Sequence, residues 1–126
     1  KTLSIEKFKG KVVLLDFWAT WCKPCLEEMP NVKRIYKQYQ TEGFEIIGIS
    51  LDSNKTALDS YIKKNDMNWP QFFDGGGWNN ALAKKYKIRS IPATYLLDRQ
   101  GKIRYKSVRG PELARAVEQL VKEKAD

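Results

Sequence analysis

The chain has 126 residues, of which 42% are hydrophobic and 30% charged, a balance typical of one globular domain with a single core. The net charge is +8, yet the 23 basic residues are spread along the chain among 15 acidic ones, and no nucleic-acid-binding motif accompanies them. No apolar run approaches the ~20 residues that a membrane-spanning helix needs. We therefore expect no nucleic-acid partner and no membrane span in this chain.

No repeat, low-complexity tract or interdomain linker interrupts the chain, so we expect one domain over residues 1–126. The sequence begins at Lys1 without a basic-then-apolar signal segment. It is compatible with a mature protein or with a domain excised from a longer anchored or multidomain protein. In the second case a leader or anchor lies outside this chain.

The first expected elements are two buried strands joined by a helix. Val12–Trp18 is an apolar run broken by one acid, which is typical of a central strand covered on both faces. A helix should open near Cys22, be kinked by Pro30 and end at Gly43. Its apolar face comprises Met29, Val32, Tyr36 and Tyr39. Phe44–Ser50 has the pattern of a second buried strand.

Shorter elements follow the second strand. Residues 56–65 have the periodicity of an amphipathic helix, and residues 69–73 have the composition of a short strand. The inward residues of that helix are Leu58, Tyr61 and Ile62. Residues 74–77 form a glycine-rich loop, after which Asn79 or Asn80 should cap a short helix.

A hairpin and a helix are expected at the end of the chain. Residues 94–97 and 102–108 resemble strands, the second alternating and half-exposed, and residues 98–101 have turn chemistry. Gly110 and Pro111 open a final helix. Its buried face comprises Leu113, Val117, Leu120 and Val121.

The order of elements is therefore βα–β–αβα–β–β–α. Alternating strands and helices favour parallel strands with right-handed crossovers, and the late hairpin adds an antiparallel edge. The sequence predicts an α/β fold with a mixed central sheet and helices on both faces.

The chain has two cysteines, Cys22 and Cys25, at a predicted strand-to-helix junction. A sulfur at a helix N-terminus meets unpaired amides and the positive end of the helix dipole, which lower the pKa of the Cys22 thiol. Lys23 acts in the same direction. Cys25 lies about one turn further on and should be more buried, yet close enough to attack a mixed disulfide formed at Cys22. The pair therefore indicates a redox-active disulfide.

Other interpretations of the pair are weaker. Two cysteines do not make a disulfide scaffold, and a zinc site needs four ligands, usually Cys and His, whereas the chain has no histidine. We therefore expect no metal, although a zinc site shared across a dimer remains an alternative. Two inert buried thiols are a further alternative, which Lys23 and Pro24 between them disfavour.

The residues around the pair resemble a known family. Residues 16–25 (Asp-Phe-Trp-Ala-Thr-Trp-Cys-Lys-Pro-Cys), 28–30 (Glu-Met-Pro) and 91–94 (Ile-Pro-Ala-Thr) are similar to the thioredoxin superfamily. More narrowly, the chain resembles the TlpA/ResA/CcmG branch, which is related to AhpC/TSA, over essentially its whole length. Gly10-Lys11 before the first strand and Glu28 three residues after the second cysteine are typical of that branch. So is an extra helix-strand insertion, here residues 52–73.

The resemblance implies a thioredoxin-like fold and a thiol–disulfide oxidoreductase that reduces protein disulfides without a cofactor. The substrates would be protein thiols or disulfides, as in a cytochrome c maturation-type or a general extracytoplasmic reductant. It further implies a periplasmic or extracytoplasmic location, with any membrane anchor in a segment absent from this chain. The upstream electron donor would be a membrane thiol reductant of the DsbD/CcdA kind, and the chain would be a monomer.

The resemblance also assigns roles to individual residues. Pro92 would be a cis-proline facing the disulfide, which leaves the backbone of Ile91 free to pair with an extended substrate. The alternative is an ordinary trans-proline. Trp21, Lys23 and Pro24 would contribute to substrate binding, whereas Trp18 belongs to the core.

Two carboxylates are candidate proton carriers. Asp16 lies inside an apolar strand, where burial raises the pKa of a carboxyl group, which suits a proton acceptor for Cys25. The alternative is an edge or otherwise satisfied aspartate. Glu28 is a second acid–base candidate or part of a substrate groove, and a plain solvated residue is an equal alternative. Trp78, beside the glycine run, is either exposed or packed over a loop.

Three other functions are alternatives. A general cytosolic thioredoxin shares the chemistry but lacks the insertion of residues 52–73. A peroxide-reducing enzyme of the same fold uses a Thr-x-x-Cys site with an arginine, which residues 21–25 fit poorly. A noncatalytic binding module would be marked by loss of a cysteine, and both Cys22 and Cys25 are present.

Overall fold

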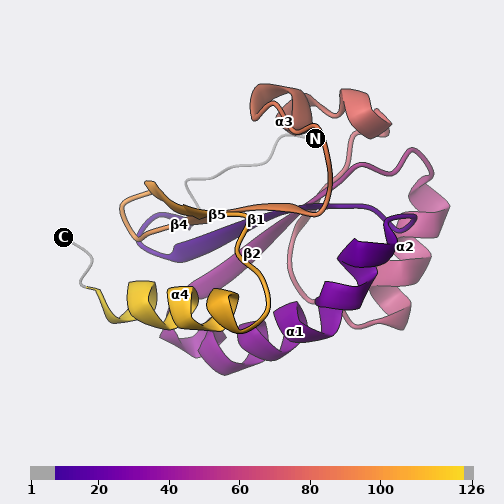
Figure 1. The fold of residues 1–126 in the computed structure, drawn as a ribbon. Coiled ribbons are helices and arrows are strands. Elements are labelled where there is room, and N and C mark those ends of the chain that lie inside the picture. The colour runs from indigo at the N-terminus through magenta and orange to yellow at the C-terminus, as the bar shows by residue number, and fades with distance from the viewer. Residues whose placement is uncertain (1–7, 124–126) are drawn as a thin grey trace.

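The computed structural model describes residues 8–123 (Figure 1). The order of elements agrees with the order predicted from the sequence. The strands are β1 (Val12–Trp18), β2 (Phe44–Ser50), β3 (Gln71–Phe72), β4 (Ala93–Leu97) and β5 (Ile103–Lys106). The helices are α1 (Lys23–Tyr39), α2 (Lys55–Lys64), α3 (Ala81–Lys85) and α4 (Pro111–Lys122), with short 3-10 helices η2 (Gln40–Glu42) and η3 (Gly77–Asn79).

The five strands form one mixed sheet in the order β3-β2-β1-β4-β5. β1 pairs in parallel with β2 and antiparallel with β4, and it is buried along its whole length, as its apolar sequence predicts. β3 extends the parallel half of the sheet, while β5 forms the antiparallel edge. The predicted mixed sheet is therefore confirmed, with β1 at its centre.

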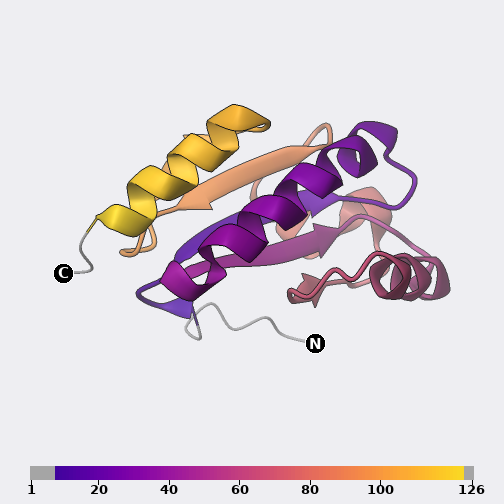
Figure 2. The same cartoon turned by 90° about the horizontal axis from the view of Figure 1, so that it is seen from below.

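Helices cover both faces of this sheet. Figures 1 and 2 show α1 and α4 side by side on one face and α3 on the other. The apolar side chains predicted to face inward from α1 and α4 are buried in the core. α2 lies beside the β3 edge of the sheet. The ring centroid of its Tyr61 is 5.5 Å from that of Trp18. The central strand β1, which leads into the cysteine pair, is therefore covered on both faces.

The helix α1 has the termini that its sequence predicts. Cys22 is the N-cap, and Pro24 occupies the first turn, where a missing N–H costs nothing. The helix continues through Pro30, and the η2 turn then ends at Gly43, whose φ of 97° is easily adopted by glycine. The predicted start and stop of this helical segment are confirmed.

The expected insertion is present as α2 and β3. Asn54 caps α2 by accepting a hydrogen bond from the N–H of Ala57 at 3.0 Å. β3 comprises two residues rather than the five predicted, because residues on either side do not continue the ladder with β2. Gln71 of β3 accepts a hydrogen bond from the indole N–H of Trp18 at 2.9 Å. The insertion is therefore joined to the end of β1 that leads into the cysteine pair.

In the second half of the chain, the structure corrects the predicted extent of β5 and decides which asparagine caps α3. β5 is shorter than predicted and mostly exposed rather than alternating, because the ladder has an irregularity at Leu96–Leu97 and Ser107 adopts a φ of 59° that ends the strand. Of the two possible caps for α3, Asn80 is the one used. Its Oδ1 accepts hydrogen bonds from the N–H groups of Leu82 and Ala83.

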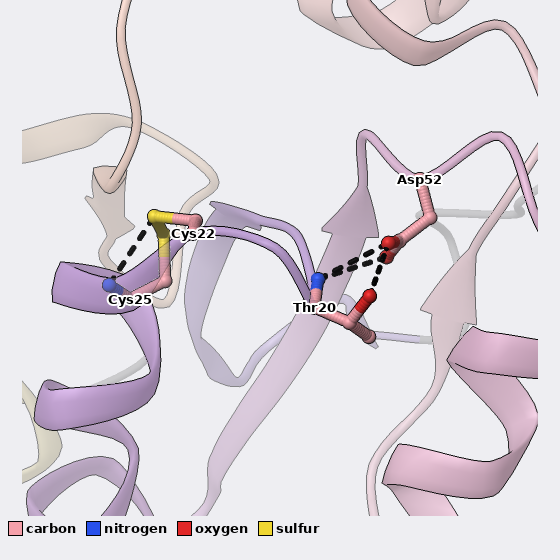
Figure 3. The surroundings of a disulfide bond; sticks show 4 residues. All are labelled: Thr20, Cys22, Cys25 and Asp52. Carbon is pink, nitrogen blue, oxygen red and sulfur yellow. Dashed lines mark hydrogen bonds between the residues drawn. A yellow bond between two sulfur atoms is a disulfide. The ribbon is translucent and has the colours of Figure 1, made fainter.

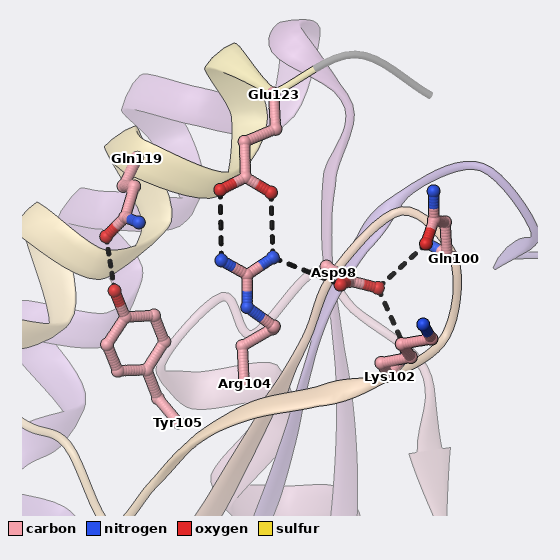
Figure 4. A network of polar contacts seen from close by, with 7 residues as sticks. All are labelled: Asp98, Gln100, Lys102, Arg104, Tyr105, Gln119 and Glu123. Carbon is pink, nitrogen blue, oxygen red and sulfur yellow. Dashed lines mark hydrogen bonds and ion pairs between the residues drawn. The ribbon is translucent and has the colours of Figure 1, made fainter. Parts of the chain in front are cut away.

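Polar contacts fasten the β4–β5 hairpin to α4 (Figure 4). Arg104 of β5 donates to Asp98 at 3.1 Å and to both carboxylate oxygens of Glu123 at 2.8 and 3.0 Å. Burial acts to raise the pKa of Asp98, but hydrogen bonds from the Lys102 N–H, from Arg104 and from the Gln100 N–H lower it overall. This network joins β5 to the turn after β4 and to the residue that follows α4.

Candidate active site

Cys22 and Cys25 form a disulfide at the N-terminus of α1, with their Cα atoms 5.3 Å apart (Figure 3). The Sγ of Cys22 accepts a hydrogen bond from the N–H of Cys25 at 3.2 Å, so a sulfur takes the place of an oxygen as helix cap. Both side chains are buried, with exposed fractions of 5% and 3%. The difference in burial expected between the two cysteines is therefore small.

The loop that carries the pair is held by a residue that the sequence reasoning missed. Asp52, 2% exposed, accepts hydrogen bonds from the Thr20 N–H at 3.1 Å and from its hydroxyl at 2.6 Å (Figure 3). It also accepts from the Ser50 hydroxyl at 2.7 Å. The available signal was an acid two residues beyond a buried parallel strand, an edge at which polar side chains gather in α/β sheets.

Asp52→Ala should lower the free energy of unfolding by about 3 kcal/mol, because it leaves the N–H and hydroxyl of Thr20 and the hydroxyl of Ser50 without their acceptor. Urea denaturation of the oxidised chain measures this. The matched control is Asp59→Ala, which removes an exposed carboxylate paired with Lys55 and should cost less than about 0.5 kcal/mol. Equal losses in the two variants would contradict the assigned role of Asp52.

Asp16 lies in the middle of β1 and is 5% exposed. Burial, followed by the charge of Glu28, raises the pKa of this carboxyl to about 7. Asp16 and Cys25 line the same cavity of about 260 Å³. The aspartate is thus neither at an edge nor exposed, and its pKa lies near neutral pH in a cavity that Cys25 also lines.

Glu28 is half-buried rather than a plain solvated residue. Its Oε2 accepts hydrogen bonds from the N–H of Gly110 at 2.8 Å and from Nδ2 of Asn31 at 2.9 Å. Asn31 also donates to the carbonyl of Gly110 at 3.1 Å. Glu28 therefore joins α1 to the residue that caps α4, while lining the same cavity as Asp16.

The Ile91–Pro92 peptide bond is cis, as the resemblance implied, and the alternative of a trans-proline is wrong. Pro92 lines the cavity together with Asp16, Cys25 and Glu28. Both Ile91 and Pro92 are half-buried, and β4 begins at the next residue. The structure thus brings residues from β1, from α1 and from the segment before β4 to one cavity.

The residues next to the two cysteines in sequence that were assigned to substrate binding are exposed. Trp21 is 55% exposed, and Lys23 and Pro24 are also exposed at the start of α1. Trp18, by contrast, is fully buried, as predicted. Trp78 is 47% exposed and lies against Trp21, with 6.0 Å between the ring centroids.

Two features are absent from residues 8–123. No helix in that range is long and apolar enough to cross a membrane. Within the same range, no three His, Cys, Asp or Glu side chains are grouped so as to hold a metal ion.

Comparison with known proteins gives consistent results. The family model described as AhpC/TSA family matches residues 1–106. The thiol-disulfide oxidoreductase ResA of Bacillus thuringiensis subsp. konkukian is 34% identical over 122 residues, which cover 97% of this chain and 68% of ResA. ResA of Oceanobacillus iheyensis is 38% identical over 102 residues, covering 81% of this chain and 52% of that protein.

Solved structures agree with these relatives. The thioredoxin domain of a thiol-disulfide oxidoreductase from Bacteroides vulgatus has a TM-score of 0.87 and 32% identity, covering 96% of this chain and 86% of that domain. A thiol-disulfide oxidoreductase from Bacteroides fragilis has a TM-score of 0.84 and 36% identity, covering 93% and 86% of the two chains.

A thioredoxin-like fold that presents a Cys-x-x-Cys disulfide at a helix N-terminus, together with these relatives, defines an enzyme of thiol–disulfide exchange. The chain belongs to the AhpC/TSA family, as a TlpA/ResA-like domain of the thioredoxin superfamily. The fold class and the family expected from the sequence are confirmed.

Proposed function

We propose that the domain reduces protein disulfides, with Cys22 as the nucleophile and Cys25 as the resolving thiol. The Cys22 thiolate attacks one sulfur of a substrate disulfide, and the other substrate sulfur leaves as a thiolate, which takes a proton from water. Cys25 then attacks the mixed disulfide, which releases the second substrate thiol and forms the Cys22–Cys25 bond. The observation that carries this proposal is the disulfide itself, with Cys22 as helix cap.

Asp16 is the proposed proton acceptor for Cys25 in the second step. A group that takes a proton near neutral pH works best with a pKa close to that pH, and the pKa of Asp16 is raised to about 7. Asp16 and Cys25 share one cavity, which supports proton transfer directly or through water. Glu28 contributes by its negative charge, which adds to the raised pKa of Asp16.

The substrate is proposed to lie across the surface around the disulfide. The backbone of Ile91, before cis-Pro92, would pair with an extended substrate segment, in the manner of strand addition. Trp21, Lys23 and Pro24 are exposed next to the two cysteines in sequence and would contact the same segment.

The setting of this activity is proposed from the relatives. A single domain that resembles ResA over 97% of its length is consistent with an extracytoplasmic or periplasmic reductant, of general or cytochrome c maturation type, without a cofactor and working as a monomer. The match covers 68% of that relative's length. Electrons would come from a membrane thiol reductant of the DsbD/CcdA kind.

The reduction potential tests the direction of electron flow. Equilibration of the full chain with glutathione buffers, followed by quantification of the Cys22–Cys25 disulfide, should give a potential at or below roughly −240 mV. A tenfold change in the equilibrium corresponds to about 30 mV for this two-electron couple, so the measurement distinguishes a reductant from an oxidant. A potential of about −120 mV, which is that of a strong oxidant, would refute the proposed reductase activity.

A further inference from the structure

Large apolar side chains are rarely left exposed on the described part of the molecule. Within residues 8–123, three are exposed: Trp21, Trp78 and Ile103. Ile103 lies on the edge strand β5, whereas Trp21 immediately precedes Cys22 and packs against Trp78. An exposed aromatic pair beside a reactive disulfide is typical of a site for another polypeptide.

Trp78 comes to this position from a segment 57 residues away in sequence from Trp21. It lies in η3, which Figure 1 shows on the sheet face opposite α1 and α4. The ring centroids of Trp78 and Trp21 are 6.0 Å apart and the rings are inclined at 48°, a geometry favourable for aromatic contact. We call these two side chains the Trp21–Trp78 platform.

The segment that carries Trp78 is held at both ends. Asp74 accepts hydrogen bonds from the N–H groups of Gly76 at 2.9 Å and Ala81 at 2.8 Å, which closes the loop around Trp78. Asn80 is fully buried and donates to the carbonyl of Ser50 at 3.2 Å, at the end of β2. A half-exposed tryptophan on a loop fixed in this way loses little conformational entropy when a ligand covers it.

Gly76 and Gly77 permit this tight loop. A Cβ on Gly76 would lie 3.1 Å from the backbone of Asn79, and Gly77 has a φ of 57°. The glycine run is therefore explained by the backbone path that brings Trp78 to Trp21.

We propose that Trp78 determines substrate specificity: with Trp21 it binds an apolar, preferably aromatic, side chain that flanks the cysteine of a protein disulfide. This inference rests on the reduction reaction proposed above. Any substrate must bring its sulfur into bonding contact with Cys22, so the residues next to the substrate cysteine lie within reach of Trp21, the neighbour of Cys22. Because the platform adjoins Cys22, we assign it to a segment of the substrate.

Two cyclic peptides test the proposal. Both contain one disulfide and differ only in the residue beside one cysteine, phenylalanine in the first and serine in the second. The second-order rate constants for their reduction by the reduced full chain give a Phe/Ser preference, which we expect to be about tenfold. Trp78→Ala should reduce this preference to near one, and Trp78→Phe should retain most of it.

Ile103→Ala is the matched control, because it removes an exposed apolar side chain away from the disulfide and should retain the wild-type preference. An unchanged preference in Trp78→Ala, or an equal slowing of both peptides, would overturn the specificity role. A Trp78-dependent dimer in sedimentation with no Phe/Ser preference would assign the platform to a second copy of the chain and overturn it as well. If the wild-type chain reduces neither peptide, the reductase itself is refuted.

Discussion

Cys22→Ser is expected to reduce disulfide reduction to the uncatalysed rate, a loss of at least ~1,000-fold, because serine has no thiolate to attack a disulfide. The Sγ of Cys22 caps α1 and is therefore the sulfur placed at the positive end of the helix dipole. The serine hydroxyl of the variant does not act as a nucleophile toward a disulfide in its place. Insulin turbidity or a peptide disulfide, with the chain pre-reduced, measures the effect.

Cys25→Ser is the matched variant, because it also lacks the Cys22–Cys25 crosslink but keeps the nucleophile. It should attack substrates once and then remain attached to them, since the resolving thiol is missing. Reducing and non-reducing gels with mass spectrometry of the adducts detect this and identify substrates. Adducts formed by Cys22→Ser in place of Cys25→Ser would reverse the assigned roles, and the absence of adducts from both would defeat the catalytic proposal.

Asp16→Asn is expected to stabilise the oxidised chain at pH 8 by up to about 4 kcal/mol and to leave its stability nearly unchanged at pH 4. The pKa of Asp16 rises from 3.8 to about 7 on folding, mainly through burial. A difference of about 3 units, at 1.36 kcal/mol each, gives this magnitude.

The sign follows from where the proton binds. Between pH 3.8 and 7 the folded chain holds a proton on Asp16 that the unfolded chain has lost, so the contribution of Asp16 to stability falls as the pH rises. Below 3.8 both states are protonated and the contribution is fully present. Above 7 the buried group is charged, and the stabilisation is lost. The neutral amide of the Asn variant removes this dependence.

Urea unfolding from pH 4 to pH 8 checks the prediction. Asp59→Asn is the control, because it removes an exposed carboxylate that does not line the cavity of Asp16. Glu28→Gln should shift the midpoint attributed to Asp16 slightly downward, since the charge of Glu28 is the smaller of the two causes. An Asp16→Asn variant with the same pH profile as the wild type would show that Asp16 does not carry the raised pKa.

The same carboxyl group shows how far the sequence predicts the site. An acid inside an apolar run indicates burial and a raised pKa, and both are found for Asp16. The Cys-x-x-Cys spacing predicts a disulfide at a helix N-terminus, which is also found. These features were predictable because each depends on residues close together in the chain.

Features that depend on distant residues were not predictable in this way. Asp52 holds Thr20 across 32 positions, and Glu28 holds Gly110 across 82. No local sequence pattern indicates either contact, because each forms only after β2 has packed beside β1 and α4 beside α1. For the same reason the sequence does not decide between an exposed Trp78 and one packed over a loop, whereas the structure places it half-exposed against Trp21.

The Cys22–Cys25 pair thus needs both levels of description. Strand periodicity, the helix cap and the two-residue spacing follow from the chain itself, since backbone geometry and burial of apolar faces act over a few residues. Which carboxylate shares a cavity with Cys25, which loop holds Thr20 and which tryptophan lies against Trp21 follow from tertiary packing. Those contacts are set by the order β3-β2-β1-β4-β5, which brings chain segments far apart in sequence to the same end of one sheet.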